Sequence, residues 1–167
     1  MGLEFYNRKT KFIIRQMAPE DSMAASQLHA NRFNPAWSYA SFYKFLNDAQ
    51  ILGWCACTQG QQEQMLGFIL LRMAADEAEI LTILTQKNSE ERGIATNLLR
   101  AAMQALHELQ ANNLYLDVDE NNHKAIKLYK KFQFKPISTR KAYYNNGAEQ
   151  KRSNAIVMCY NFCYTGL

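Results

Sequence analysis

Three neighbouring segments in the second half of the chain carry groups suited to anion binding and acid–base chemistry. The first is "NSEERGIATNLL", residues 88–99, a polar turn with one glycine that opens a long apolar-periodic segment. Free backbone N–H groups at such a helix start can bind a phosphate, but Glu90 and Glu91 stand where the phosphate would lie. Asn88 followed by Glu91 also fits a helix cap with a capping-box-like partner. We expect both roles to be compatible, with each glutamate repelling a bound phosphate by about 1 kcal/mol.

The second and third segments supply carboxylates, an amide and a phenol. In the strand-like "YLDVD" the two-residue period places Tyr115, Asp117 and Asp119 on one face. On the helix that follows, Asn122 and Tyr129 fall near one stripe, together with Ala125. Structural interpretations are also available. Asp117 fits a solvated strand residue, Asn122 a helix N-cap, and Tyr129 a core tyrosine at an apolar helical position.

The elements that must position these residues follow from periodicity and breakers. The pattern predicts helices at 18–33 (entered through Pro19), 38–48 (capped by Ser38), 92–110 and 121–132. Strands are predicted at 11–17, 51–59, 64–73, 76–84, 113–119, 135–144 and 153–162. The order β-α-α-β-β-β-α-β-α-β-β is typical of an α+β (mixed α/β) fold around one sheet. We expect an N-terminal extension at 1–10 and one domain at 11–167.

Composition excludes several other classes of protein. The 167 residues are 48% apolar and 20% charged, as in an ordinary globular chain. No apolar run reaches the roughly 18 residues of a membrane span, and the start lacks a signal-peptide core, so we expect a cytoplasmic protein without membrane attachment. The net charge of +4 is spread along the chain, which argues against specific nucleic-acid binding. The four cysteines sit in apolar settings and are expected to be buried thiols, neither disulfide-bonded nor metal-binding.

Over residues 11–162 the order and spacing of these features resemble the GNAT superfamily of acetyl-CoA-dependent N-acetyltransferases. Within it, the chain is most similar to the ribosomal-protein-alanine N-acetyltransferases. The pattern "N-x-x-A-x-x-L-Y" at 122–129, the strand "EILTIL", the "NPAW" break and the late "RKAYY" carry the resemblance. It implies the GNAT fold: one central, mixed, mostly antiparallel sheet flanked by helices.

The resemblance also implies roles for individual residues. Acetyl-CoA would lie between the fourth and fifth strands, with Tyr129 as the general acid and Asp117, or alternatively Glu79, as the general base. Neither a metal nor a covalent enzyme intermediate is implied. The implied cofactor-binding residues are Ile83, Leu84, Arg92, Gly93, Ile94, Ala95, Thr96, Asn122, Ala125 and Tyr129. The implied substrate-binding residues are Trp37, Tyr143 and Tyr144, although Trp37 also fits a core anchor for the first helix pair and the two tyrosines equally fit residues that pack the sheet.

The sequence departs from the family pattern at several places. Glu90 and Glu91 replace the usual Gln/Arg, Ala95 replaces a glycine, Asp117 replaces glutamate, and Gln133 stands where a glycine usually precedes Phe134. A left-handed Gln133 would cost roughly 1–2 kcal/mol. Ser153-Asn154 replaces an acidic pair near the peptide groove, which leaves Glu149 as the nearest substitute.

The function expected is N-acetylation of a protein N-terminal α-amine, for example that of a ribosomal protein. Two alternatives stay open: acetylation of a small-molecule amine, and a catalytically silent module that binds CoA.

Overall fold

The structure of the protein is a computed structural model that describes residues 12–60, 62–145 and 152–164, with the backbone alone for 142–145 and 152. The predicted extension at 1–10 and Glu149 lie outside the described residues. Among the described residues, no helix combines the length and the apolar character that crossing a bilayer requires.

Seven strands in the described part of the chain form one sheet, in the order β1-β2-β3-β4-β5-β7-β6. Neighbouring strands are antiparallel except for β4 and β5, so the predicted mixed, mostly antiparallel sheet is confirmed. The strands are β1 (Phe12–Gln16), β2 (Ile51–Thr58), β3 (Met65–Ala74), β4 (Glu77–Thr85), β5 (Asn113–Asp119), β6 (Lys135–Asn145) and β7 (Arg152–Asn161). The helices are α1 (Ser22–Ala30), α2 (Tyr39–Leu46), α3 (Ile94–Glu108) and α4 (His123–Lys131).

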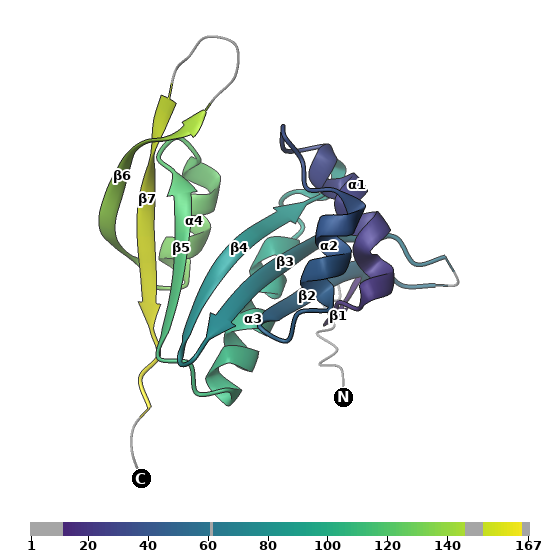
Figure 1. The fold of residues 1–167 in the computed structure, drawn as a ribbon, viewed down its shortest axis with the longest axis horizontal. Coiled ribbons are helices and arrows are strands. Elements are labelled where there is room, and N and C mark those ends of the chain that lie inside the picture. Colours follow the sequence, from purple (N-terminus) through teal and green to yellow (C-terminus); the bar gives the residue numbers. More distant parts are fainter. Residues whose placement is uncertain (1–11, 61, 146–151, 165–167) are drawn as a thin grey trace.

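The sheet separates between β4 and β5. These strands pair from Glu77 opposite Asn113 to Ile80 opposite Leu116, although β4 continues to Thr85 and β5 to Asp119. Figure 1 shows the two strands close together at one end and apart at the other. The register between β3 and β4 shifts at the same level, because Ile80 pairs with Leu71 but Thr82 pairs with Leu70. Such a bulge bends a strand and increases its twist, which turns β4 away from β5.

Helices cover both faces of the first half of the sheet (Figure 1). On β3, Ile69 and Leu71 share a core with α3, whereas the alternating Phe68 and Leu70 share another with α1 and α2. Alternation along a strand therefore assigns α3 to one face and the first helix pair to the other. Tyr129 of α4 joins the α3 core, so α4 covers the same face beyond the separation.

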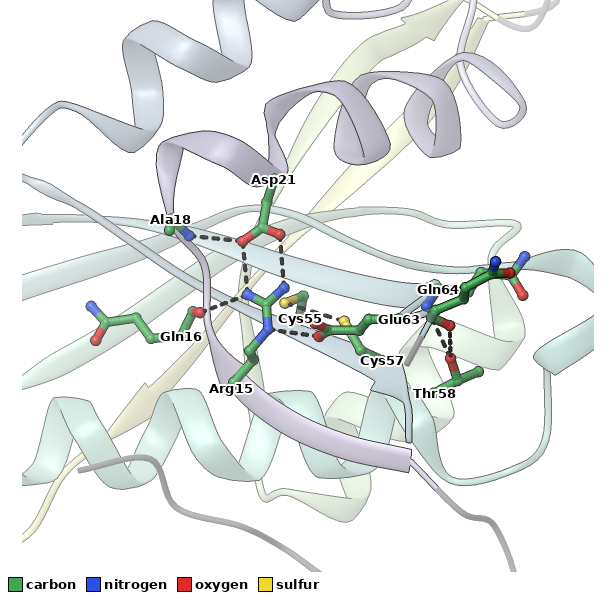
Figure 2. A network of polar contacts seen from close by, with 10 residues as sticks. Arg15, Gln16, Ala18, Asp21, Cys55, Cys57, Thr58, Glu63 and Gln64 are labelled. Atoms are coloured by element: carbon green, nitrogen blue, oxygen red, sulfur yellow. Dashed lines mark hydrogen bonds and ion pairs between the residues drawn. The ribbon is translucent and has the colours of Figure 1, made fainter. Parts of the chain in front are cut away.

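A polar network fixes the entry to α1 against β1 (Figure 2). Arg15 donates from Nη1 and Nη2 to the two carboxylate oxygens of Asp21, at 2.8 and 2.9 Å, and from Nε to Glu63 at 2.7 Å. The Ala18 N–H also donates to Asp21, at 2.8 Å. Burial acts to raise the pKa of Asp21, but the bonds from Arg15 and Ala18 lower it below its ordinary value. The charged carboxylate thus ties α1 to β1 and, through Arg15, to the β2–β3 connection.

The first two helices start as predicted and end earlier. The segment predicted at 18–33 is a 3-10 turn at Pro19–Asp21 followed by α1, and α2 ends at Leu46. Ser38 caps α2, as predicted, because its hydroxyl accepts a hydrogen bond from the Ser41 N–H at 3.2 Å.

The cysteine prediction is correct at three positions and wrong at the fourth. Cys55, Cys57 and Cys159 are buried free thiols, whereas Cys163 is a free but exposed thiol. Cys163 lies beyond the end of β7 at Asn161, where the chain has left the sheet and no longer shares its apolar face.

Candidate active site

The turn between β4 and α3 leaves backbone N–H groups available at the helix start. A 3-10 turn covers Lys87–Ser89, and α3 begins at Ile94, two residues later than predicted. Glu91 (φ +64°) and Gly93 (φ +78°) adopt left-handed backbone conformations ahead of the helix. The predicted cap by Asn88 is therefore wrong, because left-handed residues separate Asn88 from the helix it was expected to cap. Within the described part of the chain no side chain caps α3, whose first intrahelical bond runs from the Asn97 N–H to the Gly93 carbonyl.

The two glutamates of this turn are paired with cations from other elements. Glu90 accepts a hydrogen bond from Arg32 and lies 3.3 Å from the Lys124 Nζ, while Glu91 lies 3.6 Å from the same nitrogen. The bonds from Arg32 and then from Lys124 lower the pKa of Glu90 below its ordinary value. The predicted repulsion treated both glutamates as uncompensated, whereas Arg32 and Lys124 offset part of their charge. Sequence reasoning missed these partners, which lie 58 and 34 residues from Glu90.

Local hydrogen bonds hold α4 at both ends and so position Tyr129. At the start, Asn122 Oδ1 accepts a hydrogen bond from the Ala125 N–H at 3.1 Å, which confirms the predicted N-cap. At the end, the Gln133 and Phe134 N–H groups bond to the Lys130 and Tyr129 carbonyls, in a Schellman arrangement. Gln133 has φ +66°, so it adopts the left-handed conformation on which the expected strain of roughly 1–2 kcal/mol depends.

The Tyr129 side chain lies in the core beside Phe134, with ring centroids 5.6 Å apart and 5% of the tyrosine exposed. This placement fits a core tyrosine and also puts a phenol on the first helix after β5. Its catalytic role stays a prediction.

The two candidate bases lie on the same face of the sheet. Glu79 is exposed and stands opposite Tyr115 in the parallel register, and Tyr115 shares its strand face with Asp117. Asp117 is largely buried, with 13% of its side chain exposed, and its Oδ2 lies 3.0 Å from the Arg140 Nη1. The structure thus places two carboxylates with different surroundings on one face of neighbouring strands, one paired with an arginine and one facing solvent.

The predicted cofactor residues of β4 and α3 offer mainly backbone groups. Leu84 is buried in the core under α1 and α2, and Ile94 is buried in the core under α3. Ile83 is half-buried and packs against the α3 core, so Ile83 and Leu84 face opposite sides of β4. The N–H groups of Ile94, Ala95 and Thr96 precede the first intrahelical bond of α3 and have no intrahelical acceptor. These groups are suited to an anionic ligand.

The aromatic residues after α1 form a stacked cluster. Trp37 stacks on His29 with centroids 4.8 Å apart, and it meets Phe45 edge-on at 5.1 Å. The backbone N–H of Trp37 donates to His29 Nδ1 at 3.2 Å. Burial lowers the pKa of His29, which keeps the ring neutral and able to accept this bond. These contacts favour the interpretation of Trp37 as an anchor of the segment between α1 and α2.

The end of β6 carries the other two predicted substrate-binding residues. Tyr143 and Tyr144 belong to this strand, and Tyr144 stands opposite Ser153 of β7, but both side chains lie outside the described part.

Acidic side chains from the end of β5 lie against the residues that replace the family's acidic pair. Ser153 donates its hydroxyl to Asp119 at 2.6 Å, and Asn154 donates from its N–H and Nδ2 to the two Glu120 oxygens, each at 3.0 Å. Sequence reasoning missed this, because 34 residues separate the partners of each pair. Two carboxylates, at the end of β5 and directly after it, thus lie beside Ser153 and Asn154.

Comparisons with known proteins agree with this geometry. A sequence model described as the acetyltransferase (GNAT) family matches residues 16–134. A Bacillus subtilis (strain 168) protein, provisionally described as a [ribosomal protein bS18]-alanine N-acetyltransferase, is 29% identical over 141 residues, 84% of this chain and 92% of that protein. The crystal structure of the Escherichia coli ribosomal-protein-S18-alanine N-acetyltransferase superposes with a TM-score of 0.81 at 24% identity, covering 93% of this chain and 96% of the other. Arabidopsis thaliana NAA60 in complex with acetyl-CoA gives a TM-score of 0.77 at 21% identity, covering 90% and 98%.

Proposed function

Because the chain belongs to the acetyltransferase (GNAT) family, an N-acetyltransferase family with acetyl-CoA as its donor, we propose that it acetylates the N-terminal α-amine of a protein. The observation that carries the proposal is the separation of β4 from β5 beside the uncapped start of α3. The similarity to ribosomal-protein-alanine N-acetyltransferases supports a protein N-terminus as acceptor, with a ribosomal protein as the first candidate.

The residues at the separation fit the proposed cofactor. The N–H groups of Arg92 through Thr96 would hold its pyrophosphate, and the edge of β4 beyond Ile80, where pairing with β5 ends, would hold its extended arm. Asn122 and Ala125, at the start of α4, would contact the cofactor from the β5 side. Acetyl-CoA, when bound, supplies the thioester that an amine attacks.

A carboxylate on the acceptor face would take the proton of the attacking amine. An α-amine titrates near 7.7–8.0 and a lysine near 10.4, a gap of about 2.5 units or roughly 3.4 kcal/mol of deprotonation. A weak base is therefore sufficient to deprotonate an α-amine. Asp117, whose side chain is one methylene shorter than that of glutamate, fits this role. Glu79 on the neighbouring strand is the second candidate for this role.

Tyr129 would return a proton to the departing thiolate of CoA. A phenol with a pKa near 10 is a weaker acid than a thiol near 8.5, so the transfer is uphill by about 1.5 units or roughly 2 kcal/mol. This cost is small within an enzymatic barrier. Asn122 and the Schellman arrangement at Gln133 fix the helix that carries the phenol.

The acidic end of β5 supports an acceptor that carries basic residues after its N-terminus. Asp119 and Glu120 lie against Ser153 and Asn154, at the place where the related enzymes have an acidic pair. Carboxylates there would bind a lysine or arginine side chain of the acceptor peptide. Acceptor peptides with Arg or Glu at the second and third positions test this, because the acidic surface favours the arginine peptide.

The Tyr129→Phe variant tests the proposed chemistry. With an N-terminal alanine peptide as acceptor, release of CoA by this variant should fall about 100-fold or more in kcat, the usual contribution of a general acid. Thermal unfolding of the variant controls for loss of packing. Undiminished turnover would remove Tyr129 from the mechanism, and acetylation of small amines but of no peptide would reassign the acceptor. Failure of the wild-type protein to bind millimolar acetyl-CoA in calorimetry would overturn the enzymatic function altogether.

A further inference from the structure

Glu90 joins three elements that lie far apart in the chain. Its carboxylate bonds to Arg32, which follows α1, and its Oε2 lies 3.3 Å from the Nζ of Lys124 in the first turn of α4. Arg32 also donates from Nη2 to the Thr85 carbonyl, at 3.0 Å. The ammonium of Lys124 is shared with Glu91, at 3.6 Å.

The position of this cluster relates it to the cofactor site. Helix α3 follows β4 and helix α4 follows β5, and these two strands stop pairing after Ile80 and Leu116. The contact between Lys124 and Glu90 therefore links the two sides of the separation at the end where the free N–H groups of α3 lie. An anionic ligand held on those N–H groups would lie near Arg32 and Lys124, the two cations that pair with Glu90.

We propose that Arg32 and Lys124 are phosphate-binding residues of the acetyl-CoA site, and that Glu90 is their counter-ion while the cofactor is absent. Binding then exchanges a carboxylate for a phosphate as the partner of Lys124. The inference rests on the proposed function, because it requires the pyrophosphate to lie at the start of α3.

The exposure of the Lys124 side chain makes this exchange feasible. It is 77% exposed and so is free to move, and an exposed ion pair at 3.3 Å is weak. The pyrophosphate as a whole carries two negative charges against one for a carboxylate and offers more acceptor oxygens, so it competes well for the ammonium. Arg32 stays anchored by the Thr85 carbonyl and adds a second cation at a fixed place.

A double-mutant cycle between Glu90 and Lys124 tests the proposal, with binding of CoA measured by calorimetry at low salt. Glu90→Gln should tighten CoA about two- to fivefold, because it leaves both cations available to phosphate. Lys124→Ala should weaken CoA about twofold in the wild-type background and about fivefold in the Glu90→Gln background. The larger penalty without Glu90 is the signature of a lysine that moves from carboxylate to phosphate.

The opposite pattern would overturn the inference. If Lys124 only shields Glu90 from the cofactor, Lys124→Ala weakens CoA in the wild-type background and loses its effect once Glu90 is neutral. Lys127→Ala is the matched control, since it removes an exposed positive charge from the next turn of α4, and the ion pairs of Glu90 are with Arg32 and Lys124. Lys127→Ala should change the affinity for CoA by the same factor in the wild-type and Glu90→Gln backgrounds. Acetyl-pantetheine, which lacks all three phosphates, should be used equally by every variant. If the wild-type protein binds no CoA, the proposed function itself is wrong. If it binds CoA but Lys124→Ala has its larger effect in the wild-type background, this inference alone is wrong.

Discussion

The Thr82→Val variant should be more stable than the wild-type protein. Among the buried side-chain polar atoms of the described residues, Thr82 Oγ1 is the one with no hydrogen-bond partner, and the residue is 8% exposed. Leaving a buried hydroxyl without a partner costs about 1–3 kcal/mol. Valine keeps the volume and the β-branch of threonine, so the substitution removes this penalty without opening a cavity.

We expect a gain of about 1 kcal/mol, at the lower end of that range. For a chain of this size such a gain raises Tm by roughly 2–4 °C. Differential scanning calorimetry at neutral pH measures it. Thr58→Val is the matched control, because Thr58 Oγ1 accepts a hydrogen bond from the Gln64 N–H at 2.9 Å. Loss of that bond should lower Tm by a similar amount. A fall in the Tm of Thr82→Val would show that its hydroxyl has a partner in solution, and would refute the reasoning.

Two further predictions concern backbone strain and pH. Gln133→Gly should stabilise the protein by about 1 kcal/mol, since glycine adopts φ +66° without the strain of a side chain; an unchanged Tm would contradict this. The pKa of His29 is lowered in the folded state by burial, so below its ordinary value of about 6.5 the unfolded chain binds the proton more readily. Stability should therefore be full above about pH 6.5 and fall as the pH drops, and His29→Asn should flatten this dependence in thermal unfolding measured from pH 5 to pH 8.

Features set by neighbours in the chain were predictable from sequence. The caps at Ser38 and Asn122 and the left-handed Gln133 each depend on hydrogen bonds or sterics within four residues. The same holds for the shared strand face of Tyr115 and Asp117, because the side-chain period of a strand is two. The failures at Asn88 and Cys163 are also local, since a left-handed turn and the end of a strand interrupt the pattern that each prediction extended.

The order of the elements and the family could be predicted from the sequence, because the motifs and elements of the family follow one another in a fixed order along the chain. The residues 16–134 that match the family model include the turn before α3 and the Asn122–Tyr129 pattern. The family resemblance predicted the contacts of individual side chains less completely. It identified the departures at Glu90 and at Ser153–Asn154, but it could not say what compensates for them.

The sequence by itself determined the elements, the caps at Ser38 and Asn122 and the faces on which Asp117 and Tyr129 lie, because these depend on backbone geometry over one or two turns. Only the tertiary structure decided the electrostatics of the site. Glu90 meets Arg32 and Lys124, and Asp119 meets Ser153, across 34 to 58 residues. Those encounters are set by strand order and register, so the charge that a ligand would experience at this site is a property of the assembled sheet and not of any one segment.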